Sequence, residues 1–218
     1  MPIRVCIGEC SYEYNNINNI PQYDYDKIEY IEAIDMKITG TIFNKIGLRF
    51  PNLDYIDVSC CNIKKLDLIY FHNLKTLKCN KSRVKEIIGF EYCHKLEVVE
   101  LNCNILYKIE SNHNVKELSI ARNYLKEIPD FNNLEILFAS SNPCLKNLGY
   151  YPKLKKLLIA DTYIKKLDFY IDLEYLECNY TCISELHPYP KLKFLDYHDS
   201  LIKYETLPYL PSLKTTES

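Results

Sequence analysis

The chain has 218 residues, and its 27 basic side chains nearly balance its 29 acidic ones. This balance gives no global attraction to nucleic acid or to an anionic membrane, and no apolar run reaches the length of a membrane span. The first residues, MPIRVCIGECSYEY, lack the apolar stretch of a signal peptide, so we expect a cytoplasmic protein with reduced thiols and no membrane partner.

Residues 1–30 are predicted to form an N-terminal cap. They fit poorly to the repeat that begins at Ile31, although Val5 to Ile7 has the composition of an extra strand. The segment NNINNI, Asn15 to Ile20, has the composition of a loop. A stack of repeats leaves an open apolar end, and a cap of this kind covers it.

Nine segments of similar pattern then follow one another at spacings of 19 to 22 residues. They begin at Ile31, Leu53, Leu74, Leu96, Val115, Leu134, Leu154, Leu173 and Leu192. The fourth place is always aliphatic: Ile34, Ile56, Leu77, Val99, Leu118, Leu137, Leu157, Leu176 and Leu195. The sixth place runs from Met36 and Val58 to Tyr197. A fixed period of this length is typical of stacked repeats that share one continuous core.

The ninth place of each segment holds a small residue that can form hydrogen bonds. These residues are Thr39, Cys61, Ser82, Asn104, Asn123, Asn142, Thr162, Thr181 and Ser200. A buried turn needs such a residue, because its backbone groups lose their water and a short polar side chain can replace it. The ninth place is therefore predicted to lie in a buried turn.

This pattern matches L-x-x-L-x-L-x-x-N/C-x-L, and the chain resembles the leucine-rich repeat family. The resemblance covers residues 31–213. It implies a mainly β fold, a curved right-handed solenoid with one short parallel strand per repeat on its concave face. We expect about nine repeats in one solenoid over 31–213, with 214–218 as a C-terminal tail.

The return segments on the convex side are too short for regular helices. Only Pro129 and Asp130 separate Ile128 from Phe131, so this side is predicted to be extended or to hold single turns. An aromatic column is expected behind it, and Cys93 falls in the same column. The aromatic members are Phe50, Phe71, Phe131, Tyr151, Tyr170 and Tyr189.

The ten cysteines are interpreted mainly as packing residues. Cys61, Cys79 and Cys178 fall in core or turn places of the repeat, where a small thiol packs well. The sequence contains no C-x-x-C and its five histidines lack ligand spacing, so we predict no metal site. A disulfide that forms between neighbouring repeats on oxidation stays an open alternative.

Motifs of catalysis are absent from the sequence. The five glycines form no phosphate-binding loop, and neither G-x-S-x-G nor H-E-x-x-H occurs. We therefore expect no enzymatic activity, no catalytic residue and no cofactor.

Strand alternation places the third, fifth and seventh residues of each segment on the concave face. Large apolar residues gather there at Ile136, Phe138, Leu158, Tyr175 and Phe194. Acidic residues lie towards both ends, including Asp35, Asp57, Glu177 and Asp196. We expect a protein–protein interaction module in which a protein, a peptide or a second copy binds the five apolar residues. The alternative is that they cover a terminal extension or have no binding role.

The twelfth place suggests a second hypothesis. It holds Lys64, Lys85, Lys126 and Lys165, and Lys146 in the segment SNPCLKNL, whose apolar pair slips by one to Leu145 and Leu148. Stacked strands lie about 4.8 Å apart, so these lysines would form a ladder on one lateral edge that attracts nucleic acid or phosphoinositide. The next place opposes this with Glu86, Glu127 and Glu185, and nucleic acid is the less favoured partner.

Overall fold

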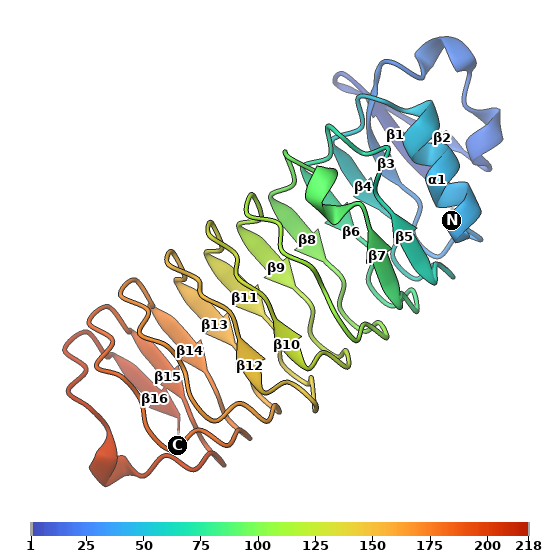
Figure 1. Ribbon diagram of the computed structural model, residues 1–218. Coiled ribbons are helices and arrows are strands. Elements are labelled where there is room, and N and C mark those ends of the chain that lie inside the picture. The colour runs from blue at the N-terminus through green and yellow to red at the C-terminus, as the bar shows by residue number, and fades with distance from the viewer. Residues whose placement is uncertain (1, 218) are drawn as a thin grey trace. The chain divides into compact units, whose positions relative to one another are not determined.

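The computed structural model describes residues 2–217, without the side chains of 215–217, and divides the chain into two compact units. The first unit is Met1–Leu106 and the second is Tyr107–Ser218. In each unit, short parallel strands follow one another side by side, one per repeat (Figure 1). The predicted fold class, a mainly β leucine-rich repeat solenoid, is confirmed.

The first unit opens with an antiparallel hairpin. Its strands β1 (Ile3–Ile7) and β2 (Cys10–Tyr14) turn at Gly8, whose φ of +58° is left-handed, and β1 also pairs with β3 (Ile28–Glu32). The strand expected at Val5 to Ile7 is thus part of β1. From β3 the order continues through the parallel strands β4 (Tyr55–Asp57), β6 (Thr76–Lys78) and β8 (Val98–Glu100).

The return segments of the first unit hold a second, smaller sheet, one 3-10 helix and one α-helix, and two further 3-10 helices lie between β2 and β3. Strands β5 (Lys65–Asp67) and β7 (Glu86–Ile88) pair in parallel. The 3-10 helices are η1 (Ile17–Asn19), η2 (Gln22–Asp24) and η3 (Phe90–Tyr92). One α-helix, α1, spans Gly40–Arg49.

The second unit repeats the same plan. Its parallel strands are β9 (Glu117–Ser119), β11 (Ile136–Phe138), β13 (Lys156–Leu158), β14 (Tyr175–Glu177), β15 (Phe194–Asp196) and β16 (Thr215–Glu217). Its return segments hold the strand pair β10 (Glu127–Ile128) and β12 (Asn147–Leu148), and the 3-10 helix η4 (Tyr204–Thr206). Residues at equal places of the repeat are paired, as with Leu118, Leu137 and Leu157.

The predicted core columns are confirmed. The fourth-place residues from Ile56 to Leu195 are each 0% exposed, and the first-place residues from Leu53 to Leu192 at most 1%. Each such side chain contributes roughly 1.5–3 kcal/mol by leaving water. The aromatic column is buried too, and in the second unit its rings stack: Tyr151 on Tyr170 at 6.3 Å and Tyr170 on Tyr189 at 6.5 Å.

The predicted register of the first repeat is wrong by three residues. The strands pair Ile31 with Ile56, whereas the alignment placed Ile34 there. The repeat therefore starts at Ile28, with Ala33 in the sixth place and Met36, not Thr39, in the ninth. Ile28, Ile31 and Ile34 all lie three residues apart, so the apolar spacing alone does not distinguish the two registers.

This error also hid the helix. Counted from Ile28 to Leu53, the first repeat is 53 − 28 = 25 residues long, and its return segment has room for α1. The Thr39 hydroxyl accepts a hydrogen bond from the Ile42 N–H at 3.5 Å and caps the helix, the usual role of threonine before a first turn. The other return segments are extended or single-turn, as predicted.

The ninth-place side chains form hydrogen bonds with buried backbone, as expected. The Asn142 amide donates to the carbonyls of Ile120 and Ala139 at 3.0 and 2.9 Å, and its oxygen accepts from the Leu125 N–H at 3.1 Å. In the first unit, Asn104 makes the equivalent bonds to the preceding turn. Ser82, Asn104 and Asn142 thereby join their own turn to the one before it, whereas the Thr162 and Thr181 hydroxyls donate to carbonyls of their own turn at 2.8 and 2.6 Å.

A left-handed residue precedes each of these side chains. The eighth place has a φ between 52° and 59° in all nine repeats: Asp35, Cys60, Lys81, Cys103, Arg122, Ser141, Asp161, Tyr180 and Asp199. Asp35 joins this column only in the corrected register. Side chains disfavour the left-handed region by roughly 1–2 kcal/mol, so the turn retains strain that the hydrogen bonds of the next residue offset.

Four cysteines complete the core. Cys61, Cys79, Cys93 and Cys178 are buried, whereas Cys10, Cys60 and Cys144 are exposed, and all ten thiols are free. Burial raises the pKa of Cys79, Cys93 and Cys178 to about 12, because a buried thiolate loses its hydration.

We expect Asn142→Leu to lower the free energy of unfolding by roughly 3 kcal/mol or more. The change leaves two buried backbone groups without a partner, the Leu125 N–H and the Ala139 carbonyl, at about 1–3 kcal/mol each, whereas the Ile120 carbonyl keeps the Asn123 amide. Urea unfolding measures this loss, and Asn132→Leu on the surface is the control that should change stability by at most about 0.5 kcal/mol. Equal losses in the two variants would contradict the role given to the ninth place.

Glycine should have opposite effects at two adjacent positions. Arg122→Gly relieves a left-handed φ and should raise the free energy of unfolding by about 0.5 kcal/mol. Ala121→Gly only adds conformational freedom to the unfolded chain and should lower the free energy of unfolding by about 1 kcal/mol. The same urea titration gives both values, and a loss in both variants would show that the turn is unstrained.

Stability should fall above pH 9 because of the buried thiols. Their pKa is about 9 in the unfolded chain and about 12 in the folded one, so only the unfolded chain loses these protons between the two values. We expect the drop between pH 8 and pH 10 to be roughly 3 kcal/mol smaller in Cys79→Ala/Cys178→Ala, at about 1.4 kcal/mol for each thiol. The exposed pair Cys60→Ala/Cys144→Ala should show the full drop, and a full drop in both double variants would refute this origin.

Candidate functional site

The five predicted binding residues lie together in the second unit, on the solvent side of strands β11, β13, β14 and β15. We call this side of the strands the strand face, and the five residues the apolar strip: Ile136, Phe138, Leu158, Tyr175 and Phe194. Phe138 is paired with Leu158, and Tyr175 with Phe194. All five are half-buried, because each is flanked by a neighbour on the adjacent strand.

A lysine divides the apolar strip. Lys156 stands between Ile136 and Tyr175 in the paired row, and its ammonium lies 4.5 Å from the centre of the Tyr175 ring and 5.3 Å from that of Phe138. Tyr175 stacks on Phe194 at 4.2 Å with 8° between the ring planes. The strip is thus an aromatic surface with a cation held at its centre, and this contact depends on side-chain conformation rather than on spacing.

A polar network borders the strip at β15. Asp196 is buried, and its carboxylate lies 2.6 Å from Nδ1 of His198. Nε2 of the same ring lies 3.1 Å from the Asn179 amide nitrogen, and Tyr180 packs edge-on against the ring at 5.1 Å. If the amide donates to Nε2, the imidazole is neutral and donates from Nδ1 to Asp196. The network holds these polar groups rigidly beside the apolar strip.

The strand face of the first unit is different. Tyr30 stacks on Tyr55 at 4.3 Å and donates its hydroxyl to Glu32 at 2.6 Å, and Lys78 pairs with Glu100 at 2.8 Å. Burial and the neighbouring Glu32 raise the pKa of Tyr30, which stays protonated. The sequence alignment missed this tyrosine pair because the shifted register placed Ala33 opposite Tyr55.

One lateral edge carries a ladder of alternating charges. The second place of the repeats from Leu53 to Leu192 holds, in turn, Asp54, Lys75, Glu97, Lys116, Glu135, Lys155, Glu174 and Lys193, whereas Glu29 before them and Lys214 after them repeat the sign of their neighbour. Ion pairs join Asp54 to Lys75 in the first unit, and Glu135 to Lys155 and Glu174 to Lys193 in the second, at 2.6–2.9 Å. Such exposed pairs add little stability individually, but their alternation favours the correct neighbour for each turn.

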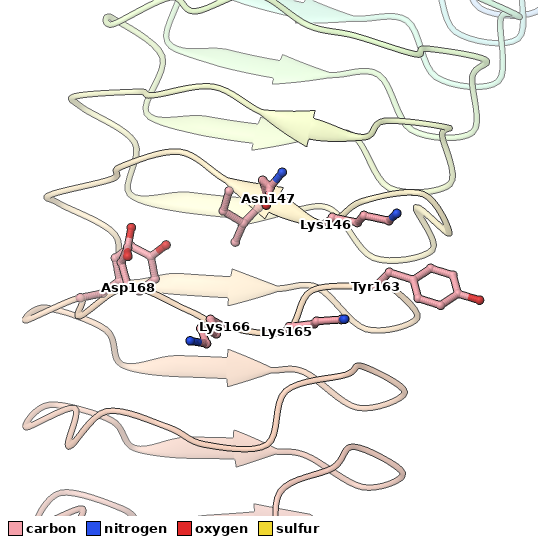
Figure 2. A pocket seen from close by; sticks show the side chains of 8 residues that line it. Lys146, Asn147, Tyr163, Lys165, Lys166 and Asp168 are labelled. Carbon is pink, nitrogen blue, oxygen red and sulfur yellow. The ribbon is translucent and has the colours of Figure 1, made fainter.

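The predicted lysine column is arranged differently. Lys126, Lys146 and Lys165 are exposed, and among the side chains described, those of residues 2–214, no ion pair is found for them. In the second unit two adjoining hollows lie along this column, and both are lined by Lys146, Asn147 and Tyr163. The larger, about 580 Å³, is also lined by Leu148, Lys165, Lys166, Asp168 and Tyr170. In Figure 2, Lys146 and Tyr163 lie at one end, Asp168 at the other, and Lys165 and Lys166 between them.

Two searches of the described residues bear on other functions. No group of three or more histidine, cysteine or acidic side chains is placed to hold a metal ion among them. Nor does this part of the chain contain a helix that is long and apolar enough to cross a membrane.

Two curated viral proteins are similar to the chain, although no protein-family model matches it. The putative leucine-rich repeat protein R380 of Acanthamoeba polyphaga mimivirus is 27% identical over 143 residues, or 62% of this chain and 34% of the relative. The uncharacterized leucine-rich repeat-containing protein AMV014/Q3 of Amsacta moorei entomopoxvirus is 26% identical over 154 residues, or 67% and 30%. The matches thus span about a third of the length of these relatives.

Two solved structures share the fold. The functional domain of InlJ from Listeria monocytogenes, which includes a cysteine ladder, has a TM-score of 0.64 at 21% identity and covers 94% of this chain and 50% of its own. A chain of the octameric complex of Latrophilin 3, Unc5D and FLRT2 (LRR) has a TM-score of 0.61 at 14% identity, with 94% and 79% covered. Repeat pattern, strand stacking and relatives agree, and the chain is a leucine-rich repeat protein.

Proposed function

We propose that the chain is a non-catalytic interaction module that binds a protein or peptide on the strand face of its second unit. The observation that carries this proposal is the apolar strip itself. Four adjacent strands present three aromatic rings and two aliphatic side chains in one half-exposed area, and aromatic residues are enriched at protein interfaces. The fold of the chain in the Latrophilin 3, Unc5D and FLRT2 complex is consistent with such a role.

The chemistry of the strip favours a particular kind of partner. Tyr175, Phe194 and Phe138 are suited to an apolar or aromatic anchor, and Lys156 at their centre offers a charge to a carbonyl or carboxylate. Glu177, which is paired with Leu158, favours a basic neighbour of that anchor. A second copy of the chain is the alternative partner. We place this binding in the cytoplasm, as the sequence predicts, and the ten free thiols are compatible with that reducing compartment.

The size of the strip suggests moderate affinity. An exposed patch of about 300–600 Å² often marks a binding site on a monomer. Burying half of it at about 25 cal/mol per Å² yields about 4–7 kcal/mol before the cost of association. This suits a partner that binds in the micromolar range, with polar contacts around the strip adding specificity.

Phe138→Asp/Leu158→Asp should abolish partner binding. The two side chains are neighbours on the strand face. Two carboxylates at these positions would be costly to desolvate, so an apolar group of the partner would no longer pack there. Affinity capture from the native cell identifies the partner bound by the wild type, titration of that purified partner measures the loss, and sedimentation reports self-association. The far-ultraviolet circular dichroism spectrum should not change.

The matched control is Tyr150→Asp/Ile171→Asp. These side chains are exposed outside the strands, each about 55%, and the change adds the same two charges. The control should keep the partner and the oligomeric state of the wild type. If the strip variant also keeps both, the strand-face proposal is wrong.

A further inference from the structure

The larger hollow on the lysine column arises from the slipped repeat. On either side of it the second residue of the apolar pair is buried, Ile128 at 1% and Leu167 at 6% exposure, whereas Leu148 is half-buried. Backbone hydrogen bonds still hold the turns next to each other, since the Lys146 N–H donates to the Lys126 carbonyl and the Tyr163 N–H donates to the Leu145 carbonyl. The slip therefore leaves a space of about 580 Å³ between two turns that are otherwise packed.

Three lysines line this space without compensation by ion pairs. Lys146 comes from one turn and Lys165 and Lys166 from the next, and all three are exposed. No side chain of residues 2–214 forms an ion pair with them, whereas Lys155 and Lys193 on the other edge each have an acidic partner. Like charges on adjacent turns are unfavourable, and a bound anion would relieve their repulsion.

Tyr170 is one of the residues that line the same space, and its buried hydroxyl donates to no acceptor among the described residues. Tyr170 is 2% exposed, and its hydroxyl has no hydrogen-bond partner in the described structure. The equivalent hydroxyls of Tyr151 and Tyr189 donate to the carbonyls of Ile128 and Asp168 at 3.1 and 3.0 Å. An unpaired buried hydroxyl costs about 1–3 kcal/mol, so an acceptor from outside the chain would be stabilising there. Burial raises the pKa of Tyr170, which keeps its proton for donation.

We propose that this hollow binds a small molecule that carries two or more phosphate groups. The three lysines bind phosphate oxygens, the Tyr170 hydroxyl donates to a further oxygen, and the exposed Tyr163 ring packs against the rest of the ligand. The volume lies in the range of small-molecule sites, about 300–1,000 Å³. Glu127 lines the smaller hollow and Asp168 lines the larger one, so an acidic residue flanks the lysines at each end. A polyanion longer than the hollow would therefore meet negative charge.

The test is calorimetric titration of the full chain with inorganic tripolyphosphate and, separately, with adenosine triphosphate. We expect one equivalent of either to bind, more weakly as salt is added. Lys146→Glu/Lys165→Glu should weaken binding at least tenfold. Lys64→Glu/Lys85→Glu alters exposed lysines of the same column in the first unit and matches the change in net charge, so it should bind as the wild type does.

Further variants separate this site from the other proposal. Tyr170→Phe should weaken tripolyphosphate binding several-fold, and unchanged binding would remove the hydroxyl from the site. Phe138→Asp/Leu158→Asp should bind tripolyphosphate like the wild type, because the apolar strip lies on the strand face. Loss of partner binding and loss of phosphate binding are therefore distinguishable failures.

Three results would overturn the proposal. The first is no heat of binding with either phosphate compound, and the second is equal weakening in both lysine double variants, which would indicate net charge alone. The third is binding of a single-stranded oligonucleotide, or of vesicles that contain phosphoinositide, more than tenfold tighter than tripolyphosphate. That result would identify an extended polyanion or a membrane surface as the ligand instead.

Discussion

Hydrogen bonds from the ninth-place side chains Ser82, Asn104 and Asn142 hold three of the repeats on the ones before them. Every turn removes backbone groups from water, and the eighth residue adds the strain of a left-handed backbone. Asn142 satisfies one N–H and two carbonyls that belong to two successive turns. These polar contacts and the backbone pairing of neighbouring strands fix the spacing of the turns, and the aliphatic places pack in columns at close to 0% exposure.

Columns also determine where function can lie. Side chains at one place of the repeat meet the same place on the next strand, so each surface is a row of near neighbours. On one edge the row alternates in sign and is closed by ion pairs such as Glu135 to Lys155. On the strand face the row contains aromatic rings, with Lys156 over Tyr175 and Phe138. On the other edge the row contains Lys146 and Lys165, for which the described side chains provide no ion pair. Because no described acidic side chain neutralises these lysines, this surface is suited to an anionic ligand.

Departures from the period create the two irregular features of the molecule. Extra length in the first repeat provides room for α1, and a slip of one residue at Leu145 and Leu148 opens the hollow above Tyr170. Both departures fall in return segments, where no strand pairing has to be kept. The two proposed sites are therefore independent: one uses the regularity of the strands, and the other uses a place where that regularity fails.

The sequence by itself determined the fold class, the register of the repeats from Leu53 on, the buried columns and the membership of the apolar strip, because a strict period translates directly into stacked places. It did not determine the first register, since Ile28, Ile31 and Ile34 satisfy the spacing equally well and only pairing with Ile56 selects Ile31. The tertiary structure alone decided the position of Lys156 over two rings and the unpaired hydroxyl of Tyr170. Both depend on side-chain conformations chosen against neighbours about 20 residues away, which no local pattern records.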